Sequence, residues 1–134
     1  MRTKITAAEK RYIDRARVCH IGSQDVSGWT HVAPLSHAYD AARRTLYVAT
    51  DGGGRTATNL RARPRASLAC DDYSENWGGL HGVLLRTRAR SVQRGAELDR
   101  ATKLLRKKFK QYRTIEIDYV IVLRIEAVVA SWGL

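Results

Sequence analysis

The chain has 134 residues, 44% of them apolar, and a formal net charge of +11. This length predicts one domain, residues 1–134, with a sizeable buried core, and the apolar content argues against a disordered chain. No apolar run approaches the ~20 residues of a membrane span, and the N-terminus has no signal-peptide core. We therefore expect a cytoplasmic protein with no membrane partner.

Arginine dominates the basic residues, with 18 of the 24. Arginine suits planar, bidentate contact to phosphate or carboxylate groups. The excess of positive charge therefore favours an anionic ligand, which is a phosphorylated cofactor, a nucleic acid or an acidic membrane surface. The alternative is that the charge serves only solubility. The two cysteines, Cys19 and Cys70, lie in apolar runs and give neither a disulfide framework nor a metal-binding spacing.

The predicted elements follow one another at close spacing. Thr6 and Glu9 form a capping-box pattern that predicts a helix over residues 7–15. Apolar and β-branched runs separated by turn signals then predict six strands, at residues 17–23, 30–39, 44–50, 65–71, 81–93 and 119–129. Apolar residues spaced by three and four predict a second helix over residues 97–112. Six strands and two helices predict a small closed β-barrel with helices packed against it.

The predicted strand over residues 81–93 alternates in character. Arg86, Arg88 and Arg90 share one face, and the small residues Thr87 and Ala89 share the other. The small residues suit a crowded barrel interior. The basic ridge of Arg86, Arg88 and Arg90 either meets an acidic ligand or nucleic acid, or is a solvated sheet face.

A glycine-rich segment, Asp51-Gly52-Gly53-Gly54-Arg55, lies between the strands predicted at 44–50 and 65–71. Three successive glycines allow positive φ angles, so the backbone N–H groups can fold inward and hold an anion. Four arginines and no acid lie between Arg55 and Arg65. The segment predicts a pocket for a phosphate-bearing ligand, and the alternative is a flexible hairpin loop with solvated charges.

Self-contained catalytic machinery is missing from the sequence. There is no G-x-S-x-G motif, no cysteine nucleophile with a nearby base and no dinucleotide fingerprint, and the four histidines are scattered. We predict no catalytic side chain and no metal ligand. If the protein is an enzyme, a cofactor supplies the chemistry and the chain positions it.

The segments HVAPLSHAYD, LYVAT, GGGRTATNLRARPRASLACDD and RIEAVVASWG occur in an order that resembles the pyridoxamine 5′-phosphate oxidase-like superfamily of split β-barrel flavoproteins. The resemblance runs from about Val18 to Leu134 and is most specific from Gly54 to Leu68. It implies a mainly β, six-stranded antiparallel split β-barrel with two flanking helices. It also implies a homodimer that binds FMN or coenzyme F420 at the subunit interface. The segments YSENW and KQYR resemble a branch that is often assigned to F420, and some relatives bind haem or a tetrapyrrole instead.

The resemblance also implies which residues bind the cofactor. They are Val32, Ala33, Pro34, Leu35 and Ser36 along the isoalloxazine ring, Ala49 and Thr50 beside the ribityl chain, Gly54, Arg55 and Thr56 around the phosphate, and Asn59 and Trp77. Asn59 braces the phosphate loop, either as a helix cap or as a second ligand. Trp77 covers the ring or the substrate, or is a buried or interface tryptophan.

Three departures from the family pattern are visible. Thr56 stands where lysine is usual, which removes one positive charge from the phosphate site, and Thr87 stands where glycine is common. The C-terminal arginine and histidine segment that the oxidases use on their substrate is missing. We therefore expect a relative and not a true pyridoxamine 5′-phosphate oxidase.

These observations predict an FMN- or F420-dependent oxidoreductase that transfers hydride at the cofactor ring, with a small-molecule substrate that the sequence does not identify. The competing class is a binding protein without catalysis, which carries a flavin, haem or a tetrapyrrole. A nucleic-acid binder is less favoured, because the aromatic residues are not interleaved with the basic runs as stacking platforms would be.

Overall fold

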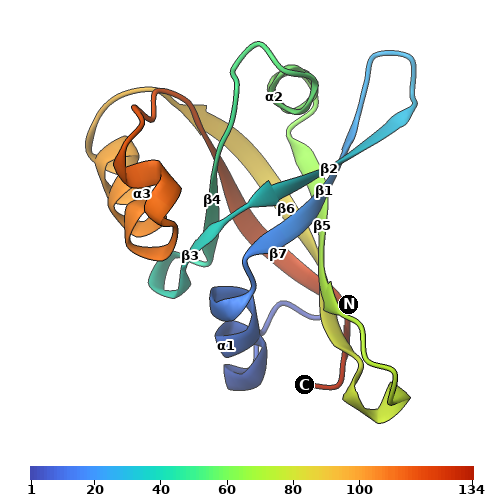
Figure 1. The fold of residues 1–134 in the computed structure, drawn as a ribbon. Coiled ribbons are helices and arrows are strands. Elements are labelled where there is room, and N and C mark those ends of the chain that lie inside the picture. The colour runs from blue at the N-terminus through green and yellow to red at the C-terminus, as the bar shows by residue number, and fades with distance from the viewer.

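A computed structural model describes all residues, 1–134, and contains one seven-stranded antiparallel sheet with three α-helices packed against it (Figure 1). The strands are β1 (Val18–Gln24), β2 (Thr30–Ser36), β3 (Ala38–Asp40), β4 (Thr45–Ala49), β5 (Arg65–Asp72), β6 (His81–Val92) and β7 (Val120–Trp132). The helices are α1 (Ala7–Arg15), α2 (Arg55–Ala62) and α3 (Ala96–Lys108), with 3-10 turns η1 (Ala41–Arg43), η2 (Trp77–Gly79) and η3 (Lys110–Arg113).

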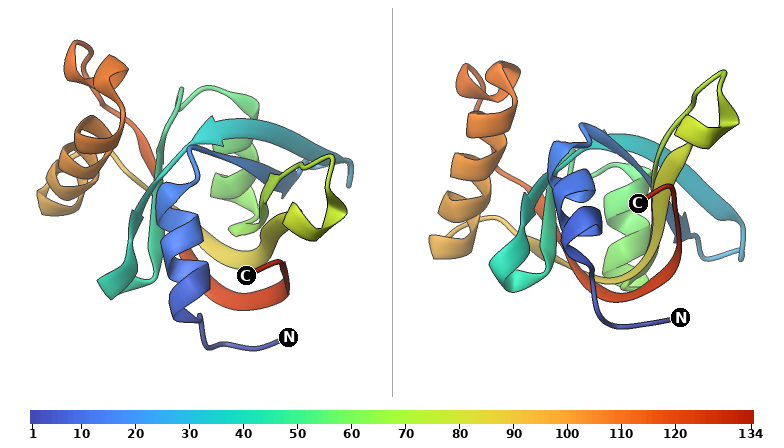
Figure 2. Two further views of the ribbon diagram at one scale, coloured as in Figure 1. Left: turned by 60° about the horizontal axis from the view of Figure 1, so that its bottom comes forward. Right: turned by 90° about the horizontal axis from the view of Figure 1, so that it is seen from below.

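The sheet curls into a split barrel, as expected. Its strand order is β2-β1-β5-β6-β7-β4-β3, so the two edge strands are β2 and β3. Because β2 runs almost directly into β3, the chain itself draws the two edges of the sheet together (Figure 2). Hydrogen bonds therefore do not close the barrel, and a split remains beside β2. The fold is an α+β antiparallel split barrel.

The prediction of six strands is wrong by one, because the strand expected over residues 30–39 breaks at His37. The His37 side chain is fully buried, and its Nε2 donates to the carbonyl oxygen of Ile13 in α1 at 2.8 Å. A carbonyl oxygen only accepts, so Nε2 must carry the proton. Burial, together with the charge of Lys108, lowers the pKa of His37 to about 4, so the ring is neutral at pH 7.

The prediction of two helices is also wrong, because α2 is a third one. In addition, the helix expected over 97–112 ends at Lys108. Phe109 is extended, with φ −125° and ψ 113°, and its ring is buried against α3. The Arg106 Nε then donates to the carbonyl oxygen of Tyr112 at 2.9 Å, which holds the following turn η3 against the helix. Apolar spacing alone did not reveal this end, since Phe109 and Tyr112 continue the helical pattern.

Two hydrophobic cores result from this arrangement. The larger one fills the barrel and includes Ile13 from α1, Leu60 from α2 and Leu68 from β5. The smaller one lies between α3 and the outer face of β4 and β7, and includes Tyr47 and Leu105. Strand β4 is therefore buried on both faces, whereas the outer faces of β5 and β6 stay open to solvent.

Helix α1 begins with the predicted capping box. The Glu9 N–H donates to the Thr6 hydroxyl at 3.2 Å, and the Thr6 N–H donates to the Glu9 carboxylate at 2.9 Å. Arg2 also binds this buried carboxylate and is the main reason that the pKa of Glu9 falls to about 2. None of the helices combines the length and apolar character needed to cross a membrane.

Candidate functional site

The split of the barrel lies between β2 and the end of β4. Strand β2 is an edge of the sheet, and β3 pairs with β4 only from Thr45 to Tyr47. Val48 and Ala49 therefore have a strand partner only on the β7 side. Strand β2, which carries residues 32–36, contacts β4, which carries Ala49 and is followed by Thr50.

Strand β2 offers backbone groups more than side chains to this split. Val32 and Pro34 project outward and are exposed, whereas Leu35 packs against the barrel core. Ala33 and Ser36 are half-buried. An edge strand leaves alternate N–H and C=O groups without a strand partner. Such groups can hydrogen-bond the rim of a planar heterocycle.

The glycine loop after β4 does not form the predicted nest. None of Gly52, Gly53 and Gly54 has a positive φ angle. The Gly53 N–H donates to Oδ1 of Asp51 at 2.9 Å, and the Gly54 N–H donates to the Asp51 carbonyl oxygen at 3.0 Å. These N–H groups are therefore satisfied within the loop. Gly52 is required for a different reason, because an added Cβ would lie 2.7 Å from Cδ2 of the Tyr119 ring.

Arg61 holds this loop in place, which the sequence reasoning missed. Its Nη1 donates to the Gly52 carbonyl oxygen at 2.6 Å and to the Tyr119 hydroxyl at 2.8 Å. The Tyr119 hydroxyl is also 2.6 Å from Oγ of Ser91 in β6. The only local sequence signal was the one-turn spacing from Thr58 to Arg61, whereas Tyr119 lies far along the chain.

Asn59 does not cap a helix, so that interpretation is wrong. It lies within α2, whose N-cap is Gly54, and it is buried. Its Nδ2 donates to Oγ of Ser23 in β1 at 3.2 Å. Asn59 therefore fastens α2 to the barrel wall from behind. Thr56 is also buried, with 6% of its surface exposed.

Arg55 is the free cation of the site. It is exposed at the first position of α2 and makes no hydrogen bond or ion pair. No side chain caps this end of α2, so the partial positive charge of the helix N-terminus adds to the guanidinium charge. The pKa of Asp25 in the β1–β2 turn is lowered mainly by Ser27, with a smaller effect of the Arg55 charge. An uncapped helix start beside an unpaired arginine suits a phosphate group.

Trp77 lies far from the other predicted residues. It belongs to the loop between β5 and β6, whereas α2 immediately precedes the opposite end of β5 (Figure 1). The eight residues of β5 span roughly 25 Å. Trp77 is 78% exposed. Within one protomer, the structure does not bring Trp77 to the split.

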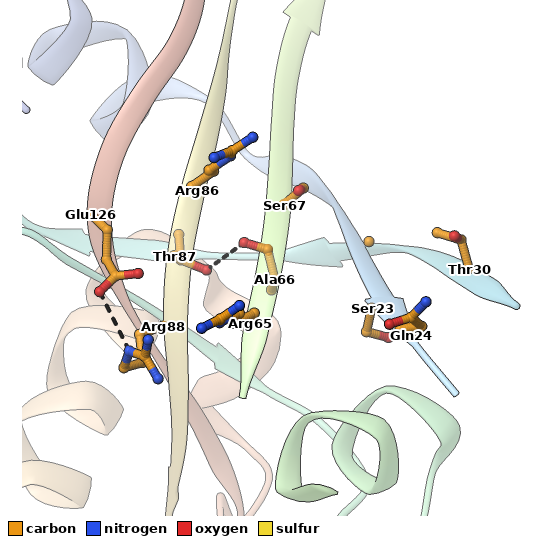
Figure 3. A pocket seen from close by; sticks show the side chains of 11 residues that line it. Ser23, Gln24, Thr30, Arg65, Ala66, Ser67, Arg86, Thr87, Arg88 and Glu126 are labelled. Atoms are coloured by element: carbon orange, nitrogen blue, oxygen red, sulfur yellow. Dashed lines mark hydrogen bonds and ion pairs between the residues drawn. The ribbon is translucent and has the colours of Figure 1, made fainter. Parts of the chain in front are cut away.

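A cavity with a volume of about 440 Å³ opens on the outer face of the sheet (Figure 3). Arg65 from β5 and Arg86 and Arg88 from β6 line one side of it. None of the twelve predicted cofactor-binding residues lines this cavity. The alternation predicted for β6 is correct, since Arg86 and Arg88 are exposed and Thr87 is buried.

Comparison with known proteins agrees with the fold. Residues 5–131 match the family model described as "Pyridoxamine 5'-phosphate oxidase". No curated protein sequence matches the chain. A conserved hypothetical protein of Mycobacterium tuberculosis is 17% identical with a TM-score of 0.77, over 96% of this chain and 84% of that one.

Two further solved structures have printed ligand descriptions. The haem storage protein HutZ of Vibrio cholerae is 15% identical with a TM-score of 0.71, over 98% of this chain and 94% of that one. An FAD-binding protein of Mesorhizobium loti is 23% identical with a TM-score of 0.71, over 95% of this chain and 91% of that one. At these identities the structural matches show a common fold.

Proposed function

Since the chain belongs to the pyridoxamine 5′-phosphate oxidase family, we propose that it is an FMN- or F420-dependent oxidoreductase acting on a small-molecule substrate. The observation that carries this proposal is the split of the barrel. The edge strand β2 contacts both β4 and α2, and a short loop joins the end of β4 to the start of α2. In the proposed site, β2 would supply backbone groups, the end of β4 would flank the ribityl chain and the start of α2 would bind the phosphate.

Each part of the cofactor has a matching part of the chain. Backbone groups of β2 near Pro34 and Leu35 would hydrogen-bond the rim of the ring, while Ala49 and Thr50 would lie along the ribityl chain. Arg55 and the uncapped start of α2 would neutralise the phosphate. The residues present therefore fit the group, although Thr56 offers no charge where relatives have lysine.

A bound flavin or deazaflavin would supply hydride-transfer chemistry at its ring. The chain's own contribution is to hold the ring face toward the substrate and to neutralise the phosphate. Holding two reactants in a productive orientation lowers the entropic part of the barrier. No side chain of the split is required to act as a covalent catalyst or as a metal ligand.

We infer further that the protein works as a homodimer. Trp77 and Trp29 are 78% and 77% exposed, and Val32 beside the split is 60% exposed. A partner subunit would cover these apolar side chains, and the family resemblance implies a homodimer. If the β5–β6 loop of one copy covers the split of the other in a two-fold pair, the same contact occurs at both splits. This arrangement would place a tryptophan over the cofactor ring from across the interface.

A haem- or tetrapyrrole-binding protein without catalysis is the second candidate. Structures described as haem proteins share the fold. In addition, His20 is exposed and lies directly opposite Pro34 in the β1–β2 register, next to the proposed ring site. An exposed imidazole there could serve as an axial ligand to iron.

The test is a titration of dialysed protein with FMN, F420 and haem, followed by fluorescence and absorbance. We expect one of the two flavin-type cofactors to bind at micromolar concentrations. Arg55→Ala should weaken this binding about tenfold, as expected for loss of a charged contact to phosphate. Arg11→Ala is the matched control, since Arg11 is equally exposed but lies on α1 without any partner.

Two results would contradict the proposal. Absence of binding of FMN and of F420 would exclude a flavin-dependent enzyme. Tight binding of haem with a Soret band that is lost in His20→Ala would assign the split to the second candidate.

A further inference from the structure

Arginines form a row across the outer face of the sheet. In the strand registers, Arg65 of β5 pairs with Arg88 of β6, and Arg88 pairs with Arg124 of β7. Arg86 lies two residues before Arg88 on the same face. Like charges at directly opposite positions of neighbouring strands destabilise a sheet. This arrangement therefore costs stability unless something neutralises it.

The chain itself supplies little neutralisation. Glu126 is the only carboxylate paired with the row, through Nε of Arg88 at 3.4 Å. Arg65, Arg86 and Arg124 make no ion pair. The next arginine along β6 is different, because Nη2 of Arg90 donates to the Glu97 carboxylate at 2.7 Å. On β6, the lack of counter-charge therefore ends at Arg90.

Arg65, Arg86 and Arg88 border the cavity of about 440 Å³ seen in Figure 3. Its far wall comes from β1 and β2, with the polar side chains of Gln24 and Thr30. Gly22 lines the cavity without a side chain, so nothing fills the space between the two walls. The exposed hydroxyl of Ser67 also lines it and makes no hydrogen bond. The cavity therefore combines two unpaired arginines, Arg65 and Arg86, and a free hydroxyl with the Arg88–Glu126 ion pair.

We propose that this cavity binds a small polyanion, a ligand with two or more phosphate or carboxylate groups. Arginine forks match both groups, because each presents paired acceptor oxygens. Arginines on neighbouring strands start about 5 Å apart, and Arg86 and Arg88 start about 7 Å apart. Several anionic groups on one ligand can engage this spacing better than one isolated anion. None of the lining residues belongs to the proposed cofactor site, so the inference does not depend on the proposed function.

The experiment is isothermal titration of the full chain at fixed ionic strength with two probes, inorganic tripolyphosphate and the tripeptide triglutamate. We expect at least one probe to bind, and the stronger one identifies phosphate or carboxylate as the ligand chemistry. Arg65→Gln and Arg86→Gln should each weaken binding about fivefold, as for loss of one partly exposed charged contact. Arg11→Gln makes the same change in net charge on α1 and should weaken binding less than about twofold.

The ligand-free protein gives a second readout. Because Arg65 faces Arg88 directly, Arg65→Gln should raise the Tm by about 2 °C, whereas Arg11→Gln should not change it.

Three results would overturn the inference. The first is no binding of either probe at millimolar concentration, and the second is an equal loss of affinity in Arg11→Gln. The third is displacement of the probes by a single-stranded oligonucleotide at a lower phosphate concentration, together with loss of oligonucleotide binding in Arg65→Gln. That result would make the face a nucleic-acid surface.

Discussion

Replacing Arg61 by methionine should loosen the loop that joins β4 to α2. The change removes two hydrogen bonds of a charged donor, to the Gly52 carbonyl oxygen at 2.6 Å and to the Tyr119 hydroxyl at 2.8 Å. Buried bonds of this kind contribute about 1.5–3 kcal/mol each, but Arg61 is exposed, so the contribution is reduced. Tyr119 keeps its contact with Ser91, and methionine keeps the apolar stem. We expect a loss of about 1.5 kcal/mol in the free energy of unfolding, or about 5 °C in Tm.

Urea unfolding followed by tryptophan fluorescence measures this change. Arg63→Met is the matched control, since Arg63 is the next arginine along the chain and its side chain makes no hydrogen bond. The cofactor affinity of Arg61→Met should fall as well, because the loop positions the start of α2. A free energy of unfolding within about 0.3 kcal/mol of the unchanged protein would refute the bracing role of Arg61.

Two further predictions concern the barrel itself. Burial lowers the pKa of His37 from 6.5 to about 4, so the unfolded chain binds a proton between these pH values and the folded chain does not. The contribution of neutral His37 to the free energy of unfolding should therefore be fully present above pH 6.5 and fall by up to about 3 kcal/mol as the pH drops to 4. His37→Gln should flatten this part of the pH profile. Gly82→Ala should lower the free energy of unfolding by about 1–3 kcal/mol, because the added Cβ would lie 2.3 Å from the Trp132 ring and 2.7 Å from the Cys70 carbonyl oxygen.

Controls are available for both predictions. Gly22→Ala places its Cβ 3.6 Å from the nearest atom, an ordinary contact, so it should be close to neutral. Equal stability of the Gly82 and Gly22 variants would show that β7 moves freely away from β6. Urea midpoints measured at pH 4.5 and 7 in the unchanged protein and in His37→Gln test the titration. An unchanged pH dependence in His37→Gln would assign it to another group.

Local signals in the sequence predicted the local elements well. Helix α1 occupies the predicted residues 7–15, because its capping box joins residues three apart. The turn between β1 and β2 contains Gly28, which has the positive φ of 92° that favours glycine. Strands β1, β4, β5 and β6 lie within one residue of their predicted bounds, since turn residues flank each apolar run.

The errors occur where a distant residue decides the backbone. The strand over residues 30–39 breaks at His37, whose partner Ile13 lies in the first helix. Helix α2 has glycine at its N-cap and no side-chain cap, so the usual start signal was absent. The glycine loop bonds to Asp51 and packs on Tyr119 instead of presenting its N–H groups, and no local pattern distinguishes these two uses of glycine.

The same division applies to the two candidate sites. The sequence by itself determined the residue types: an arginine after a glycine run, a proline-containing strand and arginines alternating along β6. Only the tertiary structure decided that β2 contacts β4 and α2, and that Arg65, Arg88 and Arg124 stand in one row. The reason is that side-chain periodicity depends on neighbours within one element. Strand register and sheet closure depend instead on contacts between residues far apart in the chain.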